Sequence, residues 1–280
     1  MKGRNRVDTI LRLRAGLRHP FHLGRFRKDR ERSESFGDDA VRYDRARPSY
    51  PDDLVRDLLA GKPRNVLDIG CGTGIGSRLF QGDGRAVLGI EPDPRMAAVA
   101  REQGLQVEEA RFEDWKPKGR RFDLLVSAQA WHWVEPTVGV EKAAKLLRAG
   151  GRFAAFWNHA VQEPEVMGIF EIVYGRHAPH LLEGDSVVLG TRQETIVDRN
   201  AIEALQANGG FTDVERRTYR WTRSYTVASW LDQLPTHNDH RFLEPEVRAA
   251  LFDELALELG HLGESFLVGY GTNMATARRI

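Results

Sequence analysis

A run of three closely spaced glycines is the part of this sequence best suited to binding a ligand. Gly70, Gly72 and Gly74 follow the apolar run Asn65–Ile69 and precede a helix-like stretch that begins at Ile75. In an open α/β sheet, ligands bind beyond the carboxyl end of a strand at such a turn. Glycine allows positive φ angles and a close approach between backbone and ligand. The pattern therefore predicts a ligand-binding loop.

The spacing of the glycines excludes two common phosphate-binding loops. A dinucleotide site has the pattern G-x-G-x-x-G. Here the sixth position is Ile75, Ser77 or Leu79, depending on which glycine starts the count. A P-loop would continue with Gly-Lys-Ser or Gly-Lys-Thr, and neither follows. What remains in residues 66–74 is apolar-apolar-Asp-apolar-Gly-x-Gly-x-Gly.

Acidic residues accompany this loop. Glu91 ends a second predicted strand, 21 positions after Gly70, close to the separation of about 20 residues seen for ribose-binding acids. Each charge-assisted bond to a diol contributes about 1.5–3 kcal/mol before desolvation. Asp68 is expected to order the loop by accepting backbone N–H groups. Cys71 has no paired base, so a packed thiol is expected rather than a nucleophile.

Strands and helices alternate along the first half of the chain. Apolar runs predict strands at 65–69, 86–90, 105–109, 122–127 and 151–157, with helices beginning near residues 75, 94 and 138. This alternation indicates a parallel sheet covered on both faces. Further strands are expected at 214–221 and 266–271, antiparallel at one edge. Segment 160–198 is too long for a simple connection and is predicted to form a lid.

These motifs resemble those of the class I S-adenosylmethionine-dependent methyltransferases. The resemblance covers roughly residues 36–157, and the rest more loosely. It implies an α/β fold with a Rossmann-like, doubly wound, seven-stranded sheet that is mostly parallel, with an antiparallel edge strand and a lid insertion. It also implies S-adenosylmethionine as cofactor and S-adenosylhomocysteine as product.

A motif near the N-terminus points to one branch of that family. The sequence Tyr43-Asp-Arg-Ala-Arg-Pro-Ser-Tyr-Pro51 is similar to a motif of small-molecule members such as the trans-aconitate methyltransferases. The resemblance implies that Tyr43 and Arg47 close over the methionine end of the cofactor. The other cofactor-binding residues that it implies are Gly70, Cys71, Gly72, Gly74, Glu91, Pro92, Met96, Phe112, Glu113, Ala128 and Gln129.

The tripeptide Trp131-His132-Trp133 follows the fourth strand, where the family places its reactive methyl group. His132 is the candidate general base if the acceptor must lose a proton. Aromatic residues at a strand end are usually core, so core and ligand-contacting roles both stay open for the two tryptophans. The substrate-binding candidates are Trp131, Trp133, Trp157, Tyr174, His177 and His237.

No metal site is expected. His177, His180, His237 and His240 lack a nearby carboxylate cluster of fitting spacing. Surface or substrate-pocket positions suit these histidines better.

The predicted function is methyl transfer to a small molecule, an aromatic or specialised metabolite methylated at O, N or C. Carboxyl methyl esterification of a small acid is the alternative. Methylation of RNA or protein through a basic N-terminal arm, and regulation by cofactor binding without catalysis, represent other classes.

Composition limits the remaining possibilities. The 280 residues are 41% hydrophobic and 29% charged, which is enough to bury the core of a large domain. A single cysteine excludes an internal disulfide and a cysteine-based zinc site. With no signal-peptide pattern, it predicts a cytoplasmic location. No apolar run approaches the roughly 18 residues of a membrane span.

Charge is distributed unevenly along the chain. Residues 1–32 carry eleven basic and three acidic side chains, and the remainder carries 30 basic and 37 acidic ones. The basic end is expected to be a solvated extension, 1–35, that is partly disordered. The acidic body disfavours nucleic acid as a partner.

The expected domain is 36–280, with a cofactor-binding core at 36–158, a lid at 160–198 and a C-terminal part at 199–280. We expect a monomer or a homodimer.

Overall fold

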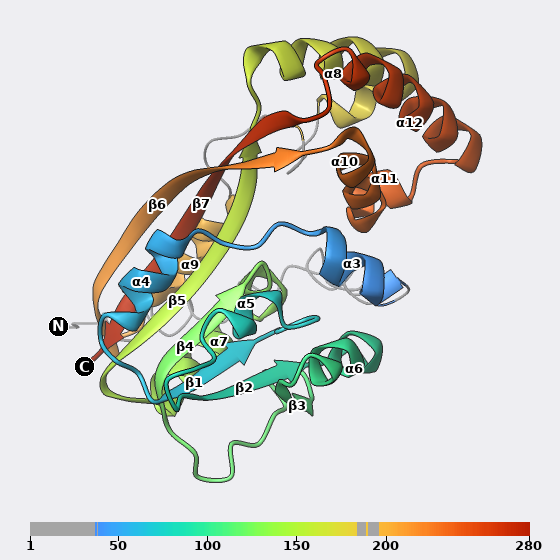
Figure 1. The fold of residues 1–280 in the computed structure, drawn as a ribbon. Coiled ribbons are helices and arrows are strands. Elements are labelled where there is room, and N and C mark those ends of the chain that lie inside the picture. Colours follow the sequence, from blue (N-terminus) through green and yellow to red (C-terminus); the bar gives the residue numbers. More distant parts are fainter. Residues whose placement is uncertain (1–36, 38, 184–188, 190–195) are drawn as a thin grey trace, which may run out of the picture. The chain divides into compact units, whose positions relative to one another are not determined.

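Seven strands form one sheet in the order β3-β2-β1-β4-β5-β7-β6 (Figure 1). The computed structural model describes residues 37, 39–183, 189 and 196–280, within the unit Phe36–Ile280. The predicted arm, 1–35, lies outside the described residues. The strands are β1 (Asn65–Ile69), β2 (Ala86–Glu91), β3 (Gln106–Glu109), β4 (Phe122–Ala128), β5 (Leu147–Val161), β6 (Phe211–Tyr225) and β7 (Phe266–Arg279).

The strand pairing confirms the predicted sheet. The pairs β1–β2, β2–β3, β1–β4 and β4–β5 are parallel, whereas β7 runs antiparallel to both β5 and β6. The antiparallel strand therefore lies one position in from the edge, and β6 forms the edge itself. Parallel pairing brings the carboxyl ends of β1, β2 and β4 to the same side of the sheet, where the glycine loop begins.

Helices cover both faces of the sheet (Figure 1). One face packs against α4 (Asp52–Leu59), α5 (Ile75–Arg78) and α6 (Pro94–Glu102), and the other against α7 (Pro136–Leu146) and α9 (Ile196–Ala207). A further helix, α3 (Ala40–Ala46), packs against α6. Helix α6 begins where the sequence predicts, because Pro94 suits its first turn and the Asp93 carboxylate accepts from the backbone N–H of Arg95 at 2.9 Å.

Strands β5, β6 and β7 continue well past the other four. Ala128, the last residue of β4, pairs with Phe156, and residues 157–161 of β5 pair onward with β7 alone. The predicted strands 151–157, 214–221 and 266–271 were therefore too short. The residues missed at the strand ends are mixed in polarity, as in 272–279 of β7, so no continuous apolar run marks them in the sequence.

A cluster of helices packs around the extended strand ends (Figure 1). These elements, called the cap here, have a separate apolar core built around the fully buried Trp230, Phe170 and Tyr174. The cap consists of α8 (Pro164–His177), η3 (Pro179–Leu181), α10 (Val227–Gln233), η4 (Leu234–Thr236), α11 (Asn238–Arg241) and α12 (Pro245–Gly260).

The cap is built from more segments of the chain than the predicted lid. Only α8 and η3 come from 160–198, of which residues 184–188 and 190–195 lie outside the described part. The C-terminal part of the chain supplies the other helices. Within the described residues, no helix is both long and apolar enough to cross a membrane.

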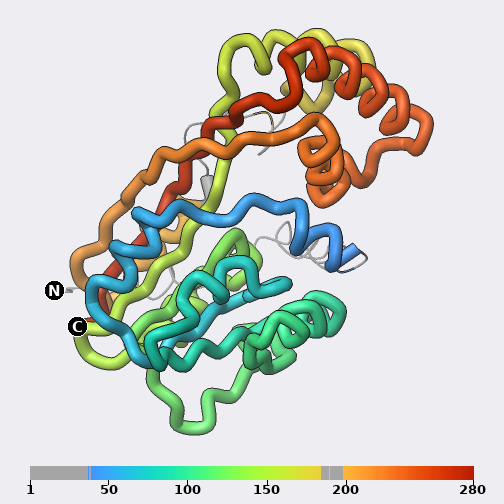
Figure 2. Tube along the Cα trace, viewed as in Figure 1, coloured from blue at the N-terminus to red at the C-terminus, as the bar shows by residue number. Residues whose placement is uncertain are grey.

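Residues 47–51, called the strap here, connect α3 to α4 between the sheet and the cap (Figure 2). On the sheet side, the Asn158 side-chain amide donates to the Ser49 carbonyl at 2.8 Å. On the cap side, the Arg47 guanidinium donates to the Thr236 carbonyl at 2.8 Å. The strap thus joins the part of the structure that carries the glycine loop to the part that carries the cap.

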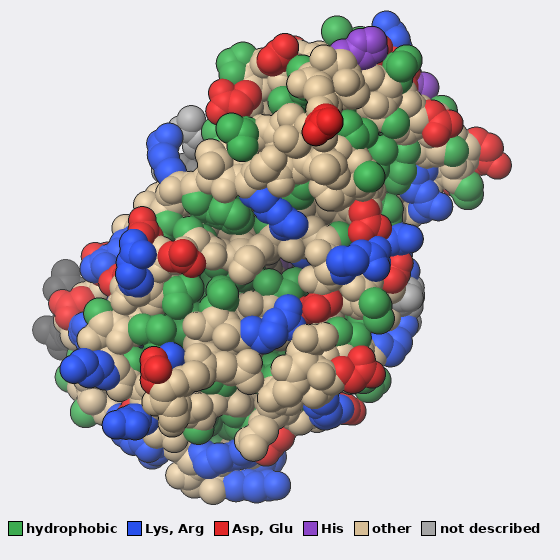
Figure 3. All heavy atoms as spheres, in the orientation of Figure 1, with side chains coloured by type: hydrophobic (Ala, Val, Ile, Leu, Met, Phe, Trp, Pro, Cys, Tyr) green, Lys and Arg blue, Asp and Glu red, His purple; other side chains and the backbone are tan. Residues whose placement is uncertain are grey.

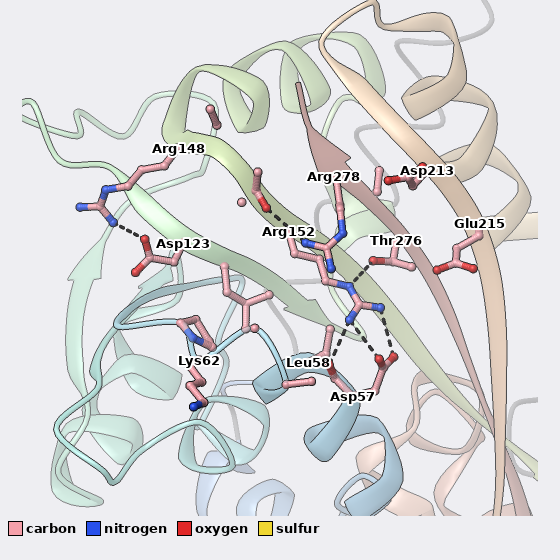
Figure 4. Close-up of a pocket in the computed structure, with 18 of the residues that line it drawn as sticks. Asp57, Leu58, Lys62, Asp123, Arg148, Arg152, Asp213, Glu215, Thr276 and Arg278 are labelled. Carbon is pink, nitrogen blue, oxygen red and sulfur yellow. Dashed lines mark hydrogen bonds and ion pairs between the residues drawn. The ribbon is translucent and has the colours of Figure 1, made fainter.

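A recess of about 430 Å³ lies at the amino ends of the parallel strands (Figure 4). At one side of it, Asp57 on α4 receives two hydrogen bonds of 3.1 Å from Arg152 on β5, together with bonds from Arg217 and Tyr219 on β6. Partial burial alone would raise the pKa of Asp57. The bonds from Arg152 and Tyr219 and the two positive charges outweigh that effect and lower it to about 2.

Replacing Asp57 by Asn should lower the free energy of unfolding by about 2 kcal/mol near neutral pH, because ionisation is favoured in the folded state. The folded-state pKa lies below the ordinary value of 3.8. The contribution is therefore complete above about pH 4 and is lost as the pH falls toward about 2. Denaturant titrations of both proteins across this range measure the difference.

Asp53→Asn is the matched control, because Asp53 lies on the same helix in an exposed pair with Arg56. Its effect should stay within about 0.5 kcal/mol. Equal losses in both variants, or a loss in Asp57→Asn that does not depend on pH, would contradict the assignment.

Candidate active site at the carboxyl ends of the strands

The glycine loop has the backbone that its sequence predicts. Gly70, Gly72 and Gly74 have φ angles of 69°, 56° and 89°, in the region that other residues rarely adopt. A Cβ on Gly70 would lie 2.5 Å from that of Ala130, so a side chain is also excluded by space. The loop is tied to the neighbouring strand, since the N–H of Gly70 donates to the Ile90 carbonyl at 2.8 Å.

Glu91 holds the middle of this loop. One carboxylate oxygen accepts from the N–H of Gly72 at 2.8 Å and the other from the N–H of Asp93 at 2.9 Å. The residue is only 8% exposed, and burial raises its pKa to about 7. Because a carboxylate has about four lone-pair positions, two remain for the hydroxyl groups of a ribose.

Asp68 lies deeper and binds a different group from the one predicted. Its Oδ2 accepts from the Ser77 hydroxyl at 2.6 Å, so it anchors the start of α5, and no hydrogen bond from a loop N–H is seen. Burial raises its pKa to about 7. Among the described residues, its Oδ1 and the hydroxyl of Thr73 are buried without a partner. These unused polar atoms beside the loop fit a polar ligand such as S-adenosylmethionine.

Cys71 is packed in the core. It is 6% exposed, and its Sγ would lie 2.5 Å from a Cβ on Gly89. Burial raises the pKa of its thiol well above the usual value. The side chain is therefore neutral and enclosed, as a structural thiol should be.

Tyr43, Arg47 and Met96 come together beside the loop. Tyr43 packs against a small buried cluster that includes Met96. The Met96 methyl group would lie 3.4 Å from a Cβ on Gly72. The Arg47 guanidinium lies over the Tyr43 ring, 5.0 Å from its centroid. Pro92 is exposed at the end of β2. The structure thus brings Tyr43 and Arg47 of the N-terminal motif close to Met96 and the glycine loop.

Phe112 and Glu113 form the turn after β3. Phe112 is buried against Trp131, and the Glu113 carboxylate accepts from the N–H of Glu135 at 2.9 Å. Lys142, which the sequence did not indicate, donates to the carbonyls of Phe112 and Glu113 and so fixes the turn. The signal in the sequence was weak, since Lys142 lies on a helix far along the chain.

The end of β4 is a strained turn. Ala128 is half-buried, and Gln129 has a φ of 58°, which is uncommon for a residue other than glycine. Two bonds hold it there. The N–H of Gln129 donates to the Phe156 carbonyl at 2.9 Å, and its side-chain amide donates to the Asn158 carbonyl at 3.1 Å. Such strain persists where the surroundings fix it, often at functional sites.

The following short helix η2 (Trp131–Trp133) separates its aromatic residues. Trp131 is 3% exposed and packs edge-on against Phe153, so the structure places it in the core. Trp133 is 36% exposed and lies beside the His132 ring. The buried Trp157 donates its indole N–H to His132 Nδ1 at 3.1 Å.

His132 is both exposed and desolvated. Its surface is accessible to water, yet desolvation by surrounding protein lowers the pKa of its imidazole. The imidazole is therefore neutral near pH 7 although it reaches solvent.

The remaining substrate candidates do not meet at His132. Tyr174 is fully buried in the cap, where its hydroxyl is bonded to His240. His177 pairs with Glu254 at the surface of the cap. His237 is different. It lies next to Thr236, which Arg47 contacts, and burial followed by the charge of Arg47 lowers its pKa.

The recess at the amino ends of the strands is a separate feature. Its lining residues come from the opposite ends of the strands, and its Arg148 and Arg152 are paired with Asp123 and Asp57 (Figure 4). It therefore shares no residue with the glycine loop. In the described part of the chain, no three His, Cys, Asp or Glu residues gather as metal ligands would.

Comparison with known proteins agrees with this geometry. The family described as methyltransferase domain matches residues 67–155. An uncharacterized methyltransferase of Mycobacterium tuberculosis is 29% identical over 234 residues, covering 81% of this chain and 86% of that protein. The family match, this relative and the sheet topology together support a class I S-adenosylmethionine-dependent methyltransferase.

Two further comparisons bear on fold and branch. A trans-aconitate 2-methyltransferase of Mycobacterium tuberculosis is 36% identical to this methyltransferase over 92 residues, which are 32% of the chain and 34% of that enzyme. A solved structure from Anaeromyxobacter dehalogenans, described as a type II methyltransferase, matches with a TM-score of 0.60 at 20% identity. It covers 83% of this chain and 97% of its own. That likeness concerns the fold.

Glu91→Gln should weaken S-adenosylhomocysteine binding to the methyltransferase at least tenfold, roughly the loss of one or two charged hydrogen bonds. Both carboxylate oxygens accept from backbone N–H groups, so an amide NH₂ would face a donor on one side. Calorimetric titration measures the dissociation constant.

Glu109→Gln makes the same change at the end of β3, where Glu109 pairs with Arg101 at the surface. It should leave the affinity nearly unchanged. Unchanged affinity in Glu91→Gln would mean that the second strand does not end at the cofactor.

The affinity of the wild-type methyltransferase for S-adenosylhomocysteine should also rise between about pH 6 and pH 8. A ribose diol donates to the ionised carboxylate, whose pKa burial raises to about 7. The ligand therefore favours the form that predominates above that pH. Glu91→Gln should flatten this dependence, and titrations at several pH values test it.

Proposed function

We propose that this enzyme methylates a small molecule held between the turn after β4, the extended part of β5 and the cap. The observation that carries the proposal is the position of the cap. Because β5 continues past the end of β4, the cap helices lie beyond the same edge of the sheet as the glycine loop. A covered edge suits an acceptor that can be enclosed away from water.

Bound S-adenosylmethionine supplies a methyl group that an acceptor lone pair displaces from the sulfonium sulfur, which keeps the electron pair of the broken bond. The chain's own contribution is to hold and align the two reactants. Effective molarities of about 10⁵–10⁸ M are available from such alignment. Glu91 and the glycine loop hold one reactant, while His132, Trp133 and the strap face the other.

A flat or aromatic acceptor is the first candidate, since the half-exposed Trp133 ring next to His132 offers a stacking surface. A carboxylate acceptor is the second. It is favoured by Arg47 Nε and His237 Nε2, both buried without a hydrogen-bond partner among the described residues. The partial likeness to a trans-aconitate 2-methyltransferase supports this second candidate.

A macromolecular acceptor finds less support. On the face seen in Figure 3, Lys and Arg side chains are interspersed with Asp and Glu, so their charges offset each other there. Nucleic-acid affinity depends on clustered basic groups. The basic residues of 1–32 are the remaining candidates for such docking, and they lie outside the described residues.

A chain that begins at Phe36 should keep its methyl-transfer rate within about twofold of the full chain, because the proposed site lies wholly in the unit Phe36–Ile280. Methyl-labelled S-adenosylmethionine and fractionated cell extract supply the assay, with mass identification of the labelled product. Thermal unfolding controls for loss of structure.

A labelled small molecule made equally by both chains supports the proposal. If the full chain transfers label to RNA or protein and the shortened chain does not, docking through the arm would be favoured. Tight cofactor binding with no labelled product from any extract would favour a regulator and contradict the proposal.

A further inference from the structure

The hydrogen bond between Trp157 and His132 restricts the proton on the imidazole. An indole N–H can only donate, and it points at His132 Nδ1 from 3.1 Å. Nδ1 must therefore offer a lone pair. A neutral imidazole that accepts at Nδ1 carries its proton on Nε2. In the imidazolium form, an N–H at Nδ1 would face the indole N–H.

Trp157 is well placed to enforce this arrangement. It is 3% exposed and packs in the core beneath α7 and α9. Its backbone pairs with Asn273 of β7, in the part of β5 that continues past β4. Trp133 also lies beside the imidazole, with ring centroids 4.6 Å apart and planes tilted by 44°. The imidazole is therefore held by two tryptophans, and its Nδ1 bonds to the buried one.

We propose that Trp157 is a positioning residue that fixes His132 as the Nε2–H tautomer, so that His132 meets the acceptor as a hydrogen-bond donor and does not remove its proton. This rests on the proposed function only in placing the acceptor beside His132. The donor role replaces the general-base role predicted from the sequence. It requires an acceptor that offers His132 a lone pair and whose reacting atom loses no proton to this histidine.

The tautomer can be read without any acceptor. In the full chain labelled with ¹⁵N-histidine, His132→Gln identifies the His132 resonances among the nine histidines. At about pH 7 we expect a protonated Nε2 and an unprotonated Nδ1. A protonated Nδ1, whether in the other tautomer or in an imidazolium, would overturn the proposal.

Two matched variants test the part played by Trp157. Trp157→Phe removes the indole N–H, so the His132 nitrogens should shift toward the averaged values of exchanging tautomers. Trp133→Phe makes the same change at the second tryptophan beside the ring, which has no hydrogen bond to the imidazole, and should leave the tautomer fixed. If Trp157→Phe also leaves it fixed, Trp157 is not the positioning residue. The wild-type spectrum remains decisive if that variant fails to fold.

Activity separates a donor from a base. A glutamine at position 132 retains an N–H donor near the position of Nε2, whereas an alanine has no donor. Neither side chain acts as a base at neutral pH. With the extract fraction that yields labelled product, His132→Ala should slow transfer about 10–100-fold, and His132→Gln should recover most of the loss. Equal losses in both variants would favour the base role. If no fraction is methylated, the proposed function fails, while the tautomer measurement stands by itself.

Discussion

Two buried carboxylates at the carboxyl edge of the sheet set the conditions for the rest of the site. The pairing of β1 with β2 places Asp68 opposite Gly89, two residues before Glu91. Burial raises the pKa of both acids to about 7, and the negative charges of Asp93 and Asp68 add to the cost of ionising Glu91. Neither has an ion pair in the part of the chain that the structure describes. The glycine loop moderates this cost by directing the N–H of Gly72 at Glu91. A ligand with hydroxyl groups and a positive charge, as S-adenosylmethionine has, complements this arrangement.

The extension of β5, β6 and β7 beyond the other strands supports the cap and its separate core. Within the cap, several buried polar groups bond to each other, as in the pairs Tyr174–His240 and Tyr225–Tyr270. Such satisfied pairs stabilise a core and need no ligand. Among the described residues, unused polar atoms occur inside the cap at Trp230 Nε1, and also where the cap meets the strap, at Arg47 Nε and His237 Nε2.

The sequence predicted the local features well and the distant contacts poorly. The bounds of β1 and the backbone of the glycine loop depend on residues within a few positions, so pattern alone specifies them. Partners far along the chain were not readable. Lys142 fixes the turn at 112–113 from a helix about 30 residues away.

Tyr174 and His177 show the same limit. They lie on one helix, yet one is buried in the cap and the other pairs with Glu254 at the surface. Their surroundings depend on α11 and α12, which come from the last third of the chain. Residue type alone therefore made both look like substrate contacts.

Asn158, which the sequence did not single out, connects the parts of this site. Its carbonyl accepts from Gln129 at 3.1 Å, its amide donates to Ser49 of the strap at 2.8 Å, and its side-chain oxygen accepts from Thr272 at 2.6 Å. Three polar groups of one residue thus link the turn after β4, the strap and β7. Because buried amides are costly to leave unpaired, movement of the strap must disturb the positive-φ turn that precedes His132. The strap also carries Arg47 beside the glycine loop, so Asn158 links the loop region to the turn before His132.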